Sequence, residues 1–123
     1  ASESGGPAIS RGNRATTMAC LNCAEVSWPS WPNIRRGVDG LLTLDDRYAA
    51  DAVRALYRAA PGETALEAGN SGAATTGGLM AIMREDSLRA ARDHLGLGPT
   101  SVVLCLCTEG AIDQAEFHRV IGA

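Results

Sequence analysis

A run of glycines and small polar residues is the first part of this sequence that could do chemistry. Residues 69–78 read Gly-Asn-Ser-Gly-Ala-Ala-Thr-Thr-Gly-Gly and lie between an apolar run at 64–68 and a helical pattern at 79–83. Small residues at a turn into a helix let another group approach the backbone closely. The free N–H groups of the first helical turn suit an anion or the polar edge of a cofactor. The alternative is that these glycines and alanines only allow close helix packing.

A second candidate follows the most apolar stretch of the chain. Val102-Val103-Leu104-Cys105-Leu106 is succeeded by Cys107-Thr108-Glu109-Gly110. A continuous apolar run is typical of a strand covered on both faces, and sites in open α/β sheets form at the carboxyl ends of strands. We therefore expect residues 69–72 and 107–110 to form one site, and Glu109 is the carboxylate there that most needs testing.

The cysteines do not predict a metal site. Cys20 and Cys23 have the C-x-x-C spacing of a zinc knuckle, but the chain holds only one such pair. Cys105 and Cys107 lie two apart, on one face of the expected strand. Buried reduced thiols are the favoured interpretation, and a structural zinc is the alternative. No catalytic residue is assigned, because the two histidines are explained by a helix end and by solvent.

Composition excludes several classes of function. All eleven basic residues among the 123 are arginine, so this chain alone has no amine for lysine-dependent covalent catalysis. The formal net charge is −3, without a basic stripe, which disfavours nucleic-acid binding. The sequence shows no membrane-length apolar run and no signal-peptide pattern, so a cytoplasmic protein without membrane contact is expected.

The elements that must position these residues alternate between two patterns. Extended patterns occupy residues 38–44, 64–68 and 100–107, and helical patterns occupy residues 46–60, 73–84, 87–95 and 112–121. This alternation predicts an α/β fold with a partial open, mostly parallel sheet flanked by helices. Residues 1–14 are expected to be an arm or linker, and residues 15–123 the α/β domain, which is expected to be a portion of something larger.

Three segments together resemble a known enzyme family. Residues 16–23 (Thr-Thr-Met-Ala-Cys-Leu-Asn-Cys), residues 70–73 (Asn-Ser-Gly-Ala) and residues 101–110 are similar to the C-terminal part of the diaminopropionate ammonia-lyase family. That family uses pyridoxal phosphate and has the fold of the tryptophan-synthase β group, to which threonine dehydratase also belongs. The resemblance covers nearly the whole chain but only about the last third of such an enzyme.

The resemblance implies which residues lie at the cofactor. In the family a Ser, Thr or Cys at the exit of the last strand bonds the pyridine nitrogen, and Cys107 matches that position, with Thr108 next to it. Two segments depart from the family pattern. Asn70 replaces a glutamate before Ser71 and Gly72, and Cys20 replaces a glycine. The cofactor-binding residues expected from the resemblance are Cys20, Asn70, Ser71, Gly72, Cys107 and Thr108.

The resemblance also implies a reaction and partners. The complete enzyme would catalyse α,β-elimination of ammonia from a diamino or hydroxy amino acid, giving a 2-keto acid, and this chain would wall the cofactor ring. Its partners would be the upstream part of the same enzyme, which supplies the Schiff-base lysine, the amino-acid substrate, and a second copy in a homodimer. A chain that lacks this lysine is expected to be inactive alone. The alternative is a free-standing α/β module that binds a small anion or a protein without catalysis.

Overall fold

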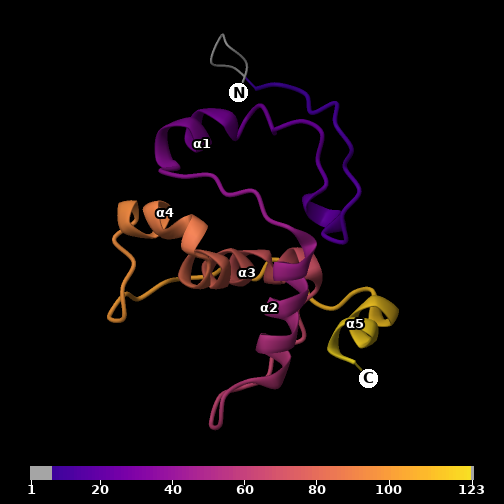
Figure 1. Ribbon diagram of the computed structural model, residues 1–123. Coiled ribbons are helices and arrows are strands. Elements are labelled where there is room, and N and C mark those ends of the chain that lie inside the picture. Colours follow the sequence, from indigo (N-terminus) through magenta and orange to yellow (C-terminus); the bar gives the residue numbers. More distant parts are fainter. Residues whose placement is uncertain (1–6, 123) are drawn as a thin grey trace.

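The computed structural model describes residues 7–122, and the fold in this range is helical (Figure 1). The start of the expected arm, residues 1–6, lies outside the described residues, as does residue 123. Five α-helices and two short 3-10 helices follow one another along the described chain. They are η1 (Ala19–Leu21), α1 (Trp31–Gly37), α2 (Asp46–Arg58), α3 (Asn70–Arg84), η2 (Asp86–Leu88), α4 (Arg89–His94) and α5 (Gln114–Ile121).

Helices α2 and α3 cross in direct contact at the centre of the molecule (Figure 1). The contact is close because α3 has Gly77 where it meets the backbone of α2. A Cβ atom added at Gly77 would lie 2.6 Å from the carbonyl oxygen of Tyr48. The neighbouring Gly78 meets only the end of the Leu42 side chain, at 3.4 Å. One glycine of this pair is therefore required by packing, and the other is not.

A small core forms where α5 lies against the crossing helices. Val53 of α2 and Phe117 of α5 are buried there, and the rings of Tyr57 and Phe117 meet edge to face, 5.5 Å between centroids. The Arg54 guanidinium donates to the carbonyl oxygen of Val120 at 2.7 Å, which fastens the last helix to α2. The core consists mostly of small side chains, as the scarcity of aromatic residues requires. Its buried members are Ala52, Val53, Ala68, Ala73, Phe117 and Val120.

The prediction of a partial open, mostly parallel sheet was wrong. Within residues 7–122 none of the three extended patterns forms a strand of a sheet. The β-pairing in this range is a single antiparallel bridge between Ala68 and Gly110. The two bonds beside it are Gly69 N–H to the Glu109 carbonyl, 3.1 Å, and Ala111 N–H to the Glu67 carbonyl, 3.1 Å. The bridge is also opposite in direction to the pairing that the alternating pattern predicted.

The physical reason for this error lies in the apolar run at 102–106. The segment has no regular secondary structure, and it contacts α3 where the Thr75 hydroxyl donates to the Leu106 carbonyl at 3.1 Å. Its side chains alternate in exposure, with Val102 fully exposed and Leu104 84% exposed, while Val103 and Cys105 are more covered. An apolar run indicates that a segment needs cover, but a strand exists only when a neighbour accepts its backbone hydrogen bonds.

The helical expectations were largely confirmed. The pattern at 46–60 forms α2, which begins after Asp45 as expected, and the pattern at 112–121 forms α5. Helix α3 begins at Asn70, three residues before the expected start, so the residues of the glycine-rich turn are already helical. The pattern at 87–95 divides into η2 and α4. No helix within residues 7–122 is both long and apolar enough to cross a membrane.

Candidate functional site

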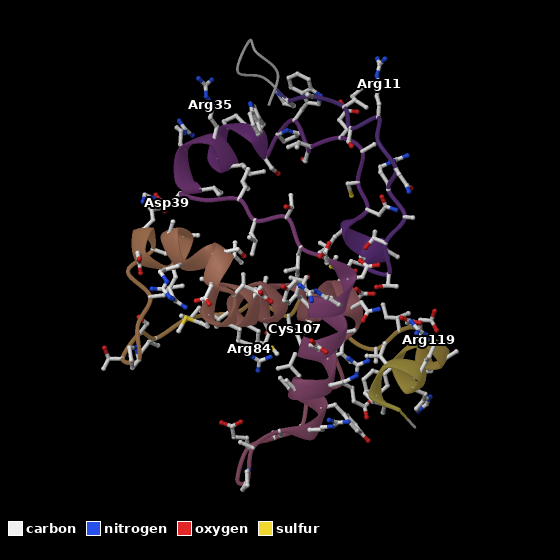
Figure 2. All side chains as sticks on the ribbon, viewed as in Figure 1. Arg11, Arg35, Asp39, Arg84, Cys107 and Arg119 are labelled. Atoms are coloured by element: carbon white, nitrogen blue, oxygen red, sulfur yellow. The ribbon has the colours of Figure 1, made fainter. Side chains whose placement is uncertain are left out.

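Three segments that are distant in sequence meet at the first turn of α3. The Cys20 N–H donates to the Ser71 hydroxyl at 3.1 Å, which joins η1 to α3. The Gly69 N–H donates to the Glu109 carbonyl at 3.1 Å, which joins the segment 107–110 to the same turn. In the view of Figure 2, Cys107 is labelled where α2 and α3 cross. The sequence thus correctly predicted that residues 69–72 and 107–110 lie together, although no sheet brings them there.

The glycines of this turn are needed for contact with residues 109–110. A Cβ atom added at Gly72 would collide with the carbonyl oxygen of Glu109, and one added at Gly69 would lie 2.7 Å from the carbonyl oxygen of Gly110. Gly72 was expected to let a cofactor approach the backbone. In the structure the close approach at its α-carbon is made by Glu109 of the same chain.

Asn70 and Ser71 are both buried, and their side chains have different partners. The Asn70 amide, in a residue 7% exposed, donates to the Glu116 carboxylate of α5 at 3.1 Å. Glu116 also accepts two bonds from the Arg119 guanidinium, at 2.7 and 2.8 Å. Arg119 first, and Asn70 after it, lower the pKa of the Glu116 carboxyl. Asn70 therefore links α3 to α5, whereas the Ser71 hydroxyl accepts the Cys20 N–H.

Cys107, Thr108 and Cys20 are exposed at the surface of this site. The Cys107 thiol donates weakly to the carbonyl oxygen of Glu109, at 3.4 Å. Cys105 is two residues away and more covered, and it borders a different hollow. The exposed hydrogen-bonding side chains of residues 107–108 are thus one thiol and one hydroxyl, both of them neutral donors.

Glu109 contacts both the first turn of α3 and Cys107. Its carbonyl oxygen accepts from Gly69 and Cys107, and its carboxylate lies against the α-carbon of Gly69. The carboxylate oxygen Oε2 is buried and has no hydrogen-bond partner among the described residues. The sequence marked Glu109 as a carboxylate to test, because it follows the apolar run. It was nevertheless absent from the expected cofactor-binding set.

Two of the hollows that border α3 differ in character. A small one of about 90 Å³ lies beside Asn70, Glu109, Asp113 and Glu116, and is therefore acidic. A larger apolar one of about 610 Å³ lies along the opposite side of the helix, bordered by Met18, Leu42, Leu79, Ile82, Val103 and Leu104. Cys107 borders neither hollow, so Asn70 and Cys107 are neighbours of one helical turn without lining one cavity.

The cysteines and acidic residues do not gather into a metal site in the described part of the chain. Among residues 7–122 no group of three His, Cys, Asp or Glu side chains is placed to hold an ion. All four cysteines are free thiols, and three of them are exposed rather than buried as expected.

The sequence is similar to that of one enzyme, diaminopropionate ammonia-lyase, from two organisms. Over 120 residues the chain is 34% identical to diaminopropionate ammonia-lyase of Salmonella typhimurium, a match that covers 97% of this chain and 30% of that enzyme. The enzyme of Escherichia coli K12 is 29% identical over 110 residues. No protein-family model matches the chain.

Solved structures agree with these sequence matches. The E. coli diaminopropionate ammonia-lyase in complex with an aminoacrylate-PLP azomethine reaction intermediate superimposes on 87% of this chain, with a TM-score of 0.79 and 29% identity. The same enzyme in complex with D-serine gives a TM-score of 0.73 over 80% of the chain. Sequence and fold together make this chain a homologue of ammonia-lyases.

The enzymes it matches are diaminopropionate ammonia-lyases, and the resemblance noted in the sequence is confirmed. The chain spans about 30% of the length of the curated relatives it matches.

Proposed function

We propose that this chain is the C-terminal portion of a pyridoxal-phosphate-dependent ammonia-lyase and that it walls the ring of the cofactor. One observation carries the proposal. The three segments that resemble cofactor-facing segments of the family, which contain Cys20, Ser71 and Cys107, converge on the first turn of α3. Their convergence is independent of the resemblance, because it depends on hydrogen bonds between residues up to 51 positions apart.

The donors at this turn fit the edge of a pyridine ring. Cys107 and Thr108 are exposed and offer a thiol and a hydroxyl, so the ring nitrogen would meet a neutral donor rather than a carboxylate. A neutral donor does not hold a full positive charge on that nitrogen. When bound, pyridoxal phosphate supplies an electron sink for the carbanion formed at the α-carbon of an amino acid. Cys107 would orient the ring, and Ser71 would hold Cys20 beside it.

Residues outside this chain would complete the site. The chain contains no lysine, so the Schiff-base amine would come from the upstream part of the longer protein. The substrate would be a diamino or hydroxy amino acid, and the products would be a 2-keto acid and ammonia. A homodimer is the assembly that the resemblance implies.

A chimera tests this proposal directly. The chain replaces the matching segment of the S. typhimurium enzyme, and the purified protein is incubated with pyridoxal phosphate, reduced with borohydride, digested and mapped. The chimera should fold, take up the cofactor and carry the reduced label on a lysine of the upstream part. The isolated chain should carry no label on any internal residue. A folded chimera without cofactor would contradict the proposal.

The structure opposes the alternative of an anion-binding module at residues 69–72. The Glu109 carboxylate lies against Gly69 at the start of α3, where an anion would have to approach. The Glu109 carboxylate and an anion bound at this helix start would repel each other. Stabilisation of the chain by phosphate that is lost in the Ser71→Glu variant would reverse this conclusion.

A further inference from the structure

We propose that the apolar hollow along α3 is the surface on which the upstream part of the longer protein docks. The hollow measures about 610 Å³ and follows the side of α3 that carries Leu79 and Ile82. The inference deepens the proposed function and rests on it, because an upstream part is expected only if this chain is a portion of a longer enzyme. It assigns a role to a region outside the expected cofactor-binding residues.

The walls of the hollow are uncharged and come from separate parts of the chain. Helix α3 forms one wall, and Leu42, Leu97 and Val103 each represent a further segment that borders it. Thr75 and Cys105 are the most polar side chains among its lining residues. An apolar surface of this kind, open to water, favours burial against another molecule. The surface that covers it must therefore be apolar as well.

The backbone beside the hollow indicates that its occupant is a polypeptide. The N–H and carbonyl groups of residues 102–106 form no backbone–backbone hydrogen bond with other described residues. The Thr75 hydroxyl, which bonds the Leu106 carbonyl, is their one side-chain partner in the described range. Buried backbone groups need partners. A small apolar molecule would bury these groups without bonding them, whereas a polypeptide segment can both donate to them and accept from them.

The position of the hollow favours the upstream part over a second copy of this chain. Its lining includes Met18 of residues 16–23, Thr75 of α3 and Cys105 of residues 101–110, so it adjoins the segments expected at the cofactor. A part that supplies the Schiff-base lysine must approach this same region. The match covers 30% of the S. typhimurium enzyme, so most of that polypeptide lies outside the matched region and is tethered to it. A tethered partner has a high effective concentration, which a free second copy lacks.

Hydrogen–deuterium exchange tests this inference in the isolated chain and in the chimera with the S. typhimurium enzyme. The amides of residues 102–106 should exchange quickly in the isolated chain, because no described backbone group accepts from them. In the chimera they should exchange at least about tenfold more slowly, because the upstream part covers them. Equal rates in the two proteins would overturn the inference. Slow exchange in the isolated chain that becomes slower with concentration would assign the hollow to a second copy and would also overturn it.

Two leucines give a matched pair of variants. Leu104 lines the hollow and is 84% exposed, whereas Leu41 is 89% exposed and is not among its lining residues. In the chimera only Leu104→Glu should abolish the slow exchange of residues 102–106 or prevent folding, because it places a charge against an apolar partner. In the isolated chain both variants should keep the midpoint of thermal unfolding. Equal effects of the two variants in the chimera would contradict docking at the hollow.

The docking inference and the proposed function can fail separately. A folded chimera that protects residues 102–106 but takes up no cofactor would support docking and contradict the proposed function. A chimera that takes up cofactor while these amides exchange quickly would do the reverse. If the chimera does not fold, the isolated chain still gives an answer. A Leu104→Glu chain with a lowered unfolding midpoint would show that the hollow belongs to the core of the chain itself, and would overturn the inference.

Discussion

The two sides of helix α3 are both apolar, but residues 7–122 cover only one of them closely. On one side Ala73, Gly77 and Ala81 are buried, and Gly77 meets the backbone of α2. On the other side Leu79 and Ile82 line an open apolar hollow of about 610 Å³. The side covered within the chain is made of glycine and alanine, whereas the open side has the larger side chains. Close packing in this molecule therefore depends on small residues that let backbones meet, more than on bulky apolar ones.

Truncating one large apolar side chain in each region tests whether the two regions differ in packing, and it has the largest expected effect. Phe117 is 5% exposed and Leu104 is 84% exposed. Phe117→Ala should lower the free energy of unfolding by about 3–5 kcal/mol, because it leaves a cavity between α2 and α5. Leu104→Ala should change it by less than about 0.5 kcal/mol. Equal losses in urea unfolding would show that the two regions do not differ.

The paired glycines of α3 test how closely the backbones of α2 and α3 pack. Gly77→Ala forces a methyl group against the Tyr48 carbonyl and should destabilise the chain by about 1–3 kcal/mol. Gly78→Ala meets only the flexible end of Leu42 and should stabilise the helix by up to about 1 kcal/mol. Thermal unfolding of both variants measures the difference. A stabilised Gly77→Ala variant would contradict the packing described here.

How much the sequence revealed also differs between the two regions. Helix periodicity located α2 and α5, and the glycine-rich run correctly marked a position of close backbone approach. Strand patterns failed at 38–44, 64–68 and 100–107, because apolar content reports a need for cover and not the identity of the neighbour. Residues 69–72 and 107–110 were predicted to lie together, and backbone hydrogen bonding at the start of α3 joins them. The link from Asn70 to Glu116 was not predictable, because it requires α5 to be placed beside α3.

The exposed apolar run at 102–106 should bind a hydrophobic dye, which is measured by the dye's fluorescence. Val102 is fully exposed and Leu104 nearly so, and exposed apolar surface binds hydrophobic dyes. The double variant Val102→Thr, Leu104→Thr should bind less dye than the wild type while its unfolding midpoint stays unchanged. Undiminished dye fluorescence would place the accessible apolar surface elsewhere, and the hollow beside Ile82 would then be the next region to alter.

The smallest expected effect concerns the contact between α2 and the residues before η1. Thr16 and Thr17 donate to Asp46, and these bonds lower the pKa of its carboxyl below the ordinary value of 3.8. A lowered pKa in the folded state stabilises the fold fully above the unfolded value, and this stabilisation is lost as the pH falls through the folded one. Asp46→Asn should therefore flatten the acid limb of the stability profile slightly. Asp39→Asn is the control, since Asp39 is exposed (Figure 2).

That prediction is checked by urea unfolding at several values between about pH 3 and pH 6. The Asp46→Asn variant should be less stable than the wild type at the upper end of this range, and the difference should shrink toward the acid end, where Asp46 of the wild type becomes protonated. Parallel profiles for the two proteins would mean that the bonds to Thr16 and Thr17 contribute nothing to folding.

The cofactor absorbance of two cysteine variants tests the central proposal, that the first turn of α3 and its neighbours wall a pyridoxal ring. Cys107 and Cys105 lie two residues apart, one at the turn and the other beside the apolar hollow. In the chimera with the S. typhimurium enzyme, Cys107→Ala should shift the absorbance of bound cofactor and weaken its binding, whereas Cys105→Ala should leave both unchanged. A cofactor that responds to Cys105 and ignores Cys107 would contradict the account.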